Sequence, residues 1–343
     1  RGSPSDNVAV VAGLGVGGLS ADQLDELDRN GFLAITGLLT DEDLAPVHDE
    51  YERILDGRVD RLLADGTLSE RPGGGFGDRY SAVLAADPLS HRWFNISLPL
   101  INGPVDAESY VMHCGPAVFD LMRHPAILDV VESVIGPEIA SNPVQQMRMK
   151  PPVDAVADES LRLHSNIGMT TWHQDIVALL PDADDTRIVT VWVALTDAFV
   201  DNGCLVSIPG SHRLGPQVHC ANEDLASEPY VPPAVLAGMK EQPLPVRRGG
   251  VVLFDKLNAH RSLPNHSGSM RWSMDLRYNP IGQGSGRPAF PTFVARSERQ
   301  PESVLEDFEA WKAMWDDARE AIVSGAYPDR IFEDVRWNDQ VAC

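Results

Sequence analysis

Residues 189–212 read VTVWVALTDAFVDNGCLVSIPGSH, and this stretch decides the fold. Two short runs rich in Val, Ile, Leu and Trp, at 188–196 and 203–208, overlap it, and Asn-Gly and Pro-Gly pairs mark turns. Comparable runs stand at 170–177, 250–255 and 271–278. No helix-length pattern separates one run from the next, so a parallel sheet with crossover helices fits poorly. The pattern predicts an antiparallel barrel of two sheets.

Helices are expected on both sides of this strand-rich region. Ser20 opens the first, because Gln23 stands at capping-box distance from it. A short strand is expected at Phe32–Ile35, and a second helix from Thr40 towards Leu55. Residues 64–80 are expected to form a Gly-rich loop that is either a connection or a lid. Two further helical regions are expected at 117–135 and 301–326.

Composition and charge narrow the class of protein. The 343 residues include 28 Lys and Arg against 50 Asp and Glu, a net charge of −22, which argues against nucleic-acid and anionic-membrane partners. No window approaches 18 consecutive apolar residues, and no signal-peptide pattern is visible. The four cysteines lack C-x-x-C spacing, which predicts ordinary reduced thiols and a cytoplasmic protein.

Near the N-terminus, Gly13, Gly15 and Gly18 match the spacing of a dinucleotide-binding loop. Such a loop needs an acidic residue at the end of the second strand to hold a ribose, but Thr36 and Gly37 stand there. A flexible N-terminal segment over 1–19 is therefore preferred. An NAD-dependent oxidoreductase remains an alternative function.

The sequence WHQD places His173 and Asp175 two residues apart in a strand-like run. Side chains alternate along a strand, so both are expected on one face, where they can bind one ion. A second imidazole would complete the two-His, one-carboxylate triad that leaves positions open on Fe(II). Taken alone, a His-x-Asp pair is more often a surface accident.

Among the other histidines, His260 is the best candidate for the third ligand. It follows the strand VVLFD at 251–255 and precedes a strand that carries Arg271. A guanidinium at that place can form a bidentate pair with a carboxylate. A five-carbon keto-diacid needs such a partner when its other end chelates iron.

The stretches QMRMKPP (146–152), WHQD, 189–212 and HRSLPNHS (260–267) with Arg271 resemble the phytanoyl-CoA dioxygenase family of Fe(II)/2-oxoglutarate oxygenases. The resemblance implies a mainly β fold, a double-stranded β-helix or jelly roll of the cupin-like type with flanking helices. It also implies that Fe(II) is bound by a triad and that O2 and 2-oxoglutarate are co-substrates. The implied iron ligands are His173, Asp175 and His260.

The resemblance further implies that 2-oxoglutarate contacts Arg271, with Gln146, Trp192 and Ser262 nearby. For Gln146, a strand residue bonded to backbone is an equal alternative. Trp192 is also a plausible core filler, and Ser262 a turn cap. Lys150 is expected only to shape the turn before Pro-Pro.

The expected organisation is a flexible segment at 1–19 and one oxygenase domain at 20–343. Within that domain we expect a helical flank and lid at 20–137, a jelly-roll core at 138–280 and a C-terminal helical extension at 281–343. The expected reaction is hydroxylation, or another oxidation, of an unactivated C–H bond of a small organic molecule, with 2-oxoglutarate converted to succinate and CO2. The breadth of the family suggests secondary metabolism or catabolism.

The segment between Lys150 and His173 is longer than such enzymes usually carry. It is therefore expected, together with the loop 64–80, to define the substrate pocket. Within it, Arg162 and His164 are candidate contacts for a polar or anionic group. A non-catalytic jelly-roll binding protein is the remaining alternative. The sequence does not indicate an oligomeric state.

Overall fold

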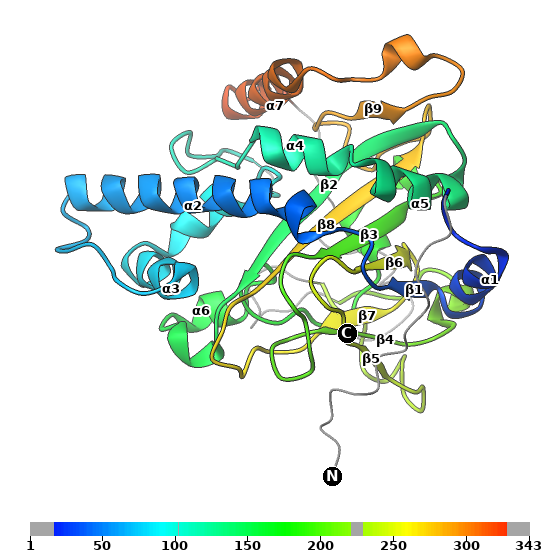
Figure 1. Cartoon of the computed structure of the whole chain (residues 1–343), viewed down its shortest axis with the longest axis horizontal. Coiled ribbons are helices and arrows are strands. Elements are labelled where there is room, and N and C mark those ends of the chain that lie inside the picture. The colour runs from blue at the N-terminus through cyan, green and yellow to red at the C-terminus, as the bar shows by residue number, and fades with distance from the viewer. Residues whose placement is uncertain (1–16, 102, 221–228, 328–343) are drawn as a thin grey trace.

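The computed structural model describes residues 17–101, 103–220 and 229–327, and within them two antiparallel sheets form the core (Figure 1). The larger sheet has the order β1-β6-β3-β8-β2-β9, with bounds Phe32–Ile35, Val251–Asp255, Val189–Ala194, Arg271–Pro280, Ile139–Lys150 and Phe293–Arg296. The smaller sheet has the order β5-β4-β7, with bounds Gln242–Leu244, Leu205–Ser207 and His260–Ser262. The predicted mainly β, two-sheet jelly-roll core is confirmed.

Strand β8 carries apolar side chains on one face and polar side chains on the other. Its even-numbered residues, among them Trp272 and Met274, join the large apolar cluster together with helix residues. Its first four odd-numbered residues, Arg271, Ser273, Asp275 and Arg277, are all buried and polar. Because successive side chains of a strand point to opposite faces, these four polar groups form a row on the other face of the sheet.

Helices cover the outer face of the larger sheet. In Figure 1, α2 (Asp41–Ala64), α4 (Pro116–Met122) and α5 (Pro125–Ile135) lie across it, and apolar residues of all three join the same cluster as β3 and β8. The other α-helices in the described ranges are α1 (Ala21–Asn30), α3 (Phe76–Ala86), α6 (Glu159–Arg162) and α7 (Phe308–Val323). A second apolar cluster, which includes Trp192, Val252 and Leu205, packs between the two sheets.

Most helix predictions are confirmed at their starts and differ at their ends. Ser20 forms the predicted capping box with Gln23, and β1 has the predicted bounds. Helix α2 starts as predicted but continues to Ala64. The predicted helix 117–135 is two helices, because Pro125 has no N–H to continue the first and instead occupies the first turn of the second.

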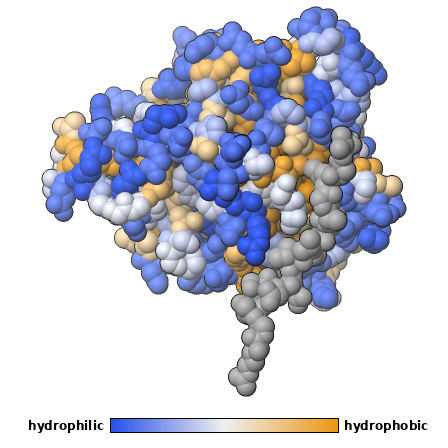
Figure 2. Space-filling view, viewed as in Figure 1, coloured by the Kyte–Doolittle hydropathy of each residue, from blue (hydrophilic) through white to orange (hydrophobic). Residues whose placement is uncertain are grey.

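The surface in Figure 2 is predominantly hydrophilic, with smaller apolar patches between the charged side chains. No helix of the described residues has both the length and the apolar character that a membrane span requires. Cys114 and Cys204 are free thiols, as expected, but Cys220 is in a disulfide bond, which corrects the expectation of four free thiols. Gly13 and Gly15 lie outside the described residues.

Candidate metal centre

His173 and Asp175 lie at the end of β7, although the predicted strand 170–177 is wrong. His173 forms only an isolated bridge with His260, in which each backbone N–H donates to the other residue's carbonyl at 3.0 Å. Asp175 begins a short 3-10 helix, η4 (Asp175–Ala178). The bend after the bridge, and not strand alternation, brings the imidazole and the carboxylate together.

The three predicted iron ligands converge on one point. Nε2 of His173 lies 3.9 Å and Nε2 of His260 lies 3.8 Å from Oδ1 of Asp175. One ligand atom from each of the three residues lies within 4.8 Å of the others. Two donors that share an ion at about 2.1 Å cannot be more than about 4.2 Å apart, and both measured distances satisfy this limit. Two imidazoles and one carboxylate are the donors that non-haem Fe(II) takes.

Main-chain carbonyls fix the tautomer of both histidines. Nδ1 of His173 lies 2.8 Å from the carbonyl oxygen of Thr171, and Nδ1 of His260 lies 3.0 Å from that of Asn258. A carbonyl only accepts, so each Nδ1 carries the proton and donates it. Each Nε2 is then left unprotonated and faces the carboxylate, as a metal ligand requires.

The carboxylate of Asp175 is buried and held by two neighbours. Arg277 donates to Oδ1 at 2.6 Å and to Oδ2 at 3.2 Å, and the Thr190 hydroxyl donates to Oδ2 at 2.5 Å. Burial opposes ionisation, but the charge and hydrogen bonds of Arg277 outweigh it and hold the pKa of Asp175 well below its usual range. Asp175 is therefore an anion in the folded protein, ready to bind a cation.

The sequence did not predict three residues that support the metal centre: His219, Arg277 and Thr190. His219 accepts a hydrogen bond from the backbone N–H of Gln174, between the two ligands, and thereby anchors the bend. Its role depends on a loop that the sequence pattern does not reveal. Arg277 and Thr190 carried a visible signal, because they lie at even spacings from Arg271 and Trp192 on buried strands.

Arg271 lies fully buried on β8, further along the same polar row. It donates to the Ser273 hydroxyl at 2.7 Å and to the carbonyl of Gly203 at 2.8 Å, and in the described part of the chain no carboxylate forms an ion pair with it. Burial, followed by the charge of Arg148, lowers its pKa to about 9. A buried guanidinium without an anion is costly, so the site fits a carboxylate ligand.

Further polar groups around Arg271 fit the same ligand. Lys150, also fully buried, is its cross-strand partner, so two cations stand side by side. The guanidinium carbon of Arg271 lies 5.6 Å from the ring centroid of Trp192. Nε of Arg271 and Nε1 of Trp192 are buried and have no hydrogen-bond partner within the described residues. Such orphaned donors indicate a missing acceptor.

The remaining predicted contacts lie on the same inner surface. Ser262 bonds to Lys150 and Thr170, so it does more than cap a turn. Gln146 accepts a hydrogen bond from the side chain of Asn166 at 2.9 Å and lines the cavity in front of the metal centre.

That cavity has a volume of about 530 Å³, and His173, Asp175 and Arg277 are among the residues that line it. Its walls come from residues 88–101 and 160–166, so the inserted segment before His173 does line it. Of the two candidate contacts there, His164 lines the cavity, whereas Arg162 donates to the carbonyl of Val156 and lies outside. The loop 64–80 does not line the cavity, which corrects the expectation of a lid there.

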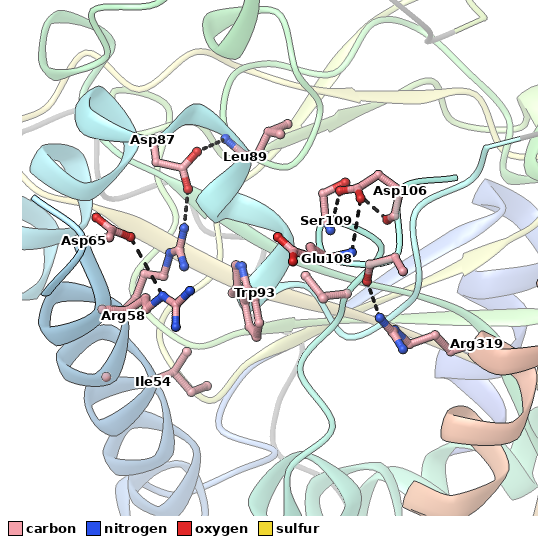
Figure 3. Close-up of a pocket in the computed structure, with 14 residues that line it drawn as sticks. Ile54, Arg58, Asp65, Asp87, Leu89, Trp93, Asp106, Glu108, Ser109 and Arg319 are labelled. Carbon is pink, nitrogen blue, oxygen red and sulfur yellow. Dashed lines mark hydrogen bonds and ion pairs between the residues drawn. The ribbon is translucent and has the colours of Figure 1, made fainter. Parts of the chain in front are cut away.

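A larger hollow of about 880 Å³ opens beside α2 and α7 and shares Leu89 and Val111 with the first cavity. Figure 3 shows that two of its arginines are engaged: Arg58 pairs with Asp87, and Arg319 donates to the backbone carbonyl of Ala107. The guanidinium of Arg58 also lies 5.5 Å from the ring centroid of Trp93. None of the three triad residues lines this hollow, so it is not the centre of the chemistry.

A two-sheet core with a His-Asp-His centre and a buried arginine defines a non-haem Fe(II)- and 2-oxoglutarate-dependent oxygenase. The sequence model of the phytanoyl-CoA dioxygenase (PhyH) family matches residues 27–273. The chain belongs to this family, and is thus an oxidoreductase that uses iron, 2-oxoglutarate and oxygen.

Individual relatives agree with this assignment. The chain is 29% identical to the 1-deoxypentalenic acid 11-beta-hydroxylase of Streptomyces exfoliatus over 80% of its length and 94% of the relative. It is 30% identical to the enzyme of the same name from Streptomyces arenae, over 52% of the chain and 62% of that relative, less than two thirds. The solved structure of the non-heme monooxygenase ThoJ has the same fold, with a TM-score of 0.53 at 18% identity over 88% of this chain and 98% of that one.

Proposed function

We propose that this protein hydroxylates an unactivated C–H bond of a small organic molecule, with His173, Asp175 and His260 as the iron ligands. The convergence of these three ligand atoms within 4.8 Å, where His173 and Asp175 also line a cavity, carries the proposal. When bound, iron together with O2 and 2-oxoglutarate supplies the oxidation: one oxygen atom enters the product, the other enters succinate, and CO2 leaves.

The residues of the chain supply orientation and charge. Backbone carbonyls hold both imidazole rings, and Arg277 with Thr190 holds the Asp175 carboxylate. We propose that Arg271 and Lys150 bind the distal carboxylate of 2-oxoglutarate, with Trp192, Ser262 and Gln146 lining its site. The two adjacent buried cations and the orphaned Nε of Arg271 support this placement.

The substrate is proposed to have a substantial apolar part. The wall of the cavity contains Leu98, Leu100, Ile101, Leu161 and Val177. Its volume is in the range that accommodates a small-molecule ligand. Hydroxylation is the proposed outcome, as in the reaction named for the two Streptomyces relatives.

An anaerobic titration of metal-free protein with Fe(II) and 2-oxoglutarate tests the proposal. We expect a visible charge-transfer band in the parent that needs both additions, and no band in His173→Ala. Arg271→Ala should keep iron binding but weaken 2-oxoglutarate binding about 10- to 100-fold, because a charge-assisted pair is lost. Arg213→Ala, at an exposed pair with Asp28, serves as the control. A parent protein that is folded and binds iron without a band would contradict the proposal.

We further propose a cytoplasmic location and no nucleic-acid or membrane partner, from the net charge of −22 and the free thiols of Cys114 and Cys204. Mass spectrometry of protein alkylated directly in cells tests the location. Complete alkylation of Cys114 and Cys204 would agree with the cytoplasm, whereas oxidation of either thiol would indicate an oxidising compartment.

A further inference from the structure

Two histidines outside the metal centre line the same cavity as His173 and Asp175. His91 lies in the 3-10 helix η2 (Pro88–Phe94), and His164 follows α6. Their ring centroids are 4.5 Å apart with an interplanar angle of 56°. The pair thus joins two segments far apart in the sequence on one wall of the proposed substrate site.

The backbone assigns opposite tautomers to the two rings. Nδ1 of His91 lies 2.8 Å from the carbonyl oxygen of Pro88, which only accepts, so this Nδ1 carries a proton. The backbone N–H of Asn166 donates to Nδ1 of His164 at 3.2 Å, so that Nδ1 carries none. A neutral His91 therefore has an accepting Nε2, and a neutral His164 has a donating Nε2–H.

Both rings are neutral at pH 7. Burial lowers the pKa of His91, and burial together with the charges of Arg148 and Arg92 lowers the pKa of His164 to about 3. Nearby arginines of the cavity are engaged elsewhere: Arg148 donates to Asp275 at 2.7 Å, and Arg92 donates to the carbonyl of Ser109 at 3.1 Å.

We propose that Nε2 of His91 and Nε2–H of His164 together bind an alcohol hydroxyl of the substrate, and that this pair orients the substrate before the metal centre. The proposal rests on the proposed function of this site. A hydroxyl donates to His91 and accepts from His164 at the same time. A carboxylate only accepts and would leave His91 facing a second acceptor, and an ammonium only donates and would leave His164 facing a donor.

The test uses metal-free protein, so that it is independent of iron and 2-oxoglutarate binding. Imidazole ¹H–¹⁵N spectra of histidine-labelled protein report the tautomer of each ring and its response to probes. The probes are cyclohexanol, cyclohexanecarboxylate and cyclohexylammonium, which share one ring and differ in their polar group. We expect the two assigned tautomers, and shifts of Nε2 in both rings with cyclohexanol alone.

Variants make the test specific to the pair. His164→Phe should weaken cyclohexanol binding roughly 5- to 10-fold, the loss of about one hydrogen bond, while His164→Gln restores a donor and most of the affinity. His266→Phe, in an exposed turn, is the matched control. The resonances of the other histidines show that each variant is folded.

Three results would overturn the proposal. They are the opposite tautomer in either ring, larger Nε2 shifts with cyclohexanecarboxylate than with cyclohexanol, and no shift with saturating cyclohexanol. A charge-transfer band that persists in the parent alongside any of these results would leave the iron and 2-oxoglutarate sites standing.

Discussion

At the scale of the residue, Asp175 is kept ionised inside the protein by Arg277. The aspartate is 2% exposed and the arginine 3%, and two of the guanidinium nitrogens reach the two carboxylate oxygens. A buried carboxylate without such a partner takes up a proton. Arg277 is therefore a positioning residue: it orients the carboxylate proposed to bind the metal and preserves its charge.

Replacing this arginine should expose the cost of the buried charge. Arg277→Met should lower the free energy of unfolding at pH 7 by about 3–5 kcal/mol, because Asp175 loses its partner. In the parent, the folded pKa lies below 3.8, so this stabilisation persists until the pH falls through that low value. In the variant the pKa rises, so the difference in stability between parent and variant should shrink from pH 7 to pH 5.

Urea unfolding of the metal-free proteins at both pH values measures this effect. Arg296→Met, which removes the partly exposed pairs with Asp129 and Glu132, is the control and should cost about 1 kcal/mol or less at either pH. A constant difference between parent and Arg277→Met would show that Asp175 does not change its proton affinity.

How far the site could be predicted also depends on individual residues. The spacing in WHQD and the position of His260 after a strand predicted that these three side chains converge, and the structure brings them together; their role as iron ligands stays a proposal. The geometry behind it was not predicted, since the bend at Asp175 is held by Gln174 and His219 across 45 residues of sequence. Lys150 was read as a turn residue, because its neighbour Arg271 lies opposite only once the strands pair.

At the scale of the element, a buried carboxylate ties α2 to α4. Glu50 on α2 accepts from Nε2 of His113 at 2.7 Å and from the backbone N–H of Ala117 at 2.9 Å. Ala117 stands in the first turn of α4, where N–H groups have no partner within the helix. The side chain of one helix thus completes the N-terminus of the next.

Glu50→Ala should therefore lower the free energy of unfolding by about 2–4 kcal/mol, because a buried donor on each side loses its acceptor. Glu52 lies two residues further along α2 and pairs with Arg79 at the surface. Glu52→Ala should lower the free energy of unfolding by about 1 kcal/mol or less. Thermal unfolding of both variants beside the parent checks this. An equal loss of stability in the two variants would show that the buried Glu50 contacts stabilise the fold no more than the surface pair of Glu52.

Helix positions show where sequence patterns stop being informative. The caps at Ser20 and Thr40 were visible because a capping box is a local pattern of three to four residues. The end of α2 could not be predicted from a local pattern, because its second half is held by buried Val59 and Leu62 in the large cluster. Tertiary packing of this kind extends a helix beyond its own signals.

At the scale of the whole molecule, the larger sheet takes strands from both ends of the chain. β1 pairs with β6, and β9 pairs with β2, although neither β1 nor β9 lies within 138–280. We propose that the chain from residue 20 onward forms one oxygenase domain. The strand-rich centre is then only part of a folding unit.

A fragment of residues 138–280 should accordingly fail to fold. It lacks β1 and β9 as well as the helices that cover Val191, Val193 and Met274, so its large apolar face would be exposed to water. We expect poor amide dispersion in its NMR spectrum and no cooperative thermal transition. The full chain, as the reference, should unfold in one transition. A folded fragment would contradict the single-domain proposal.

The mutual backbone bridge of His173 and His260 has a consequence for local opening. Each residue's amide hydrogen is protected by the other's carbonyl, and the two imidazoles are proposed ligands of one ion. An ion held by both imidazoles adds its binding free energy to every opening that separates these segments. Exchange of these two amide hydrogens with deuterium should therefore slow as metal occupancy rises, while the remote bridge of Ala198 and Val246 exchanges at an unchanged rate.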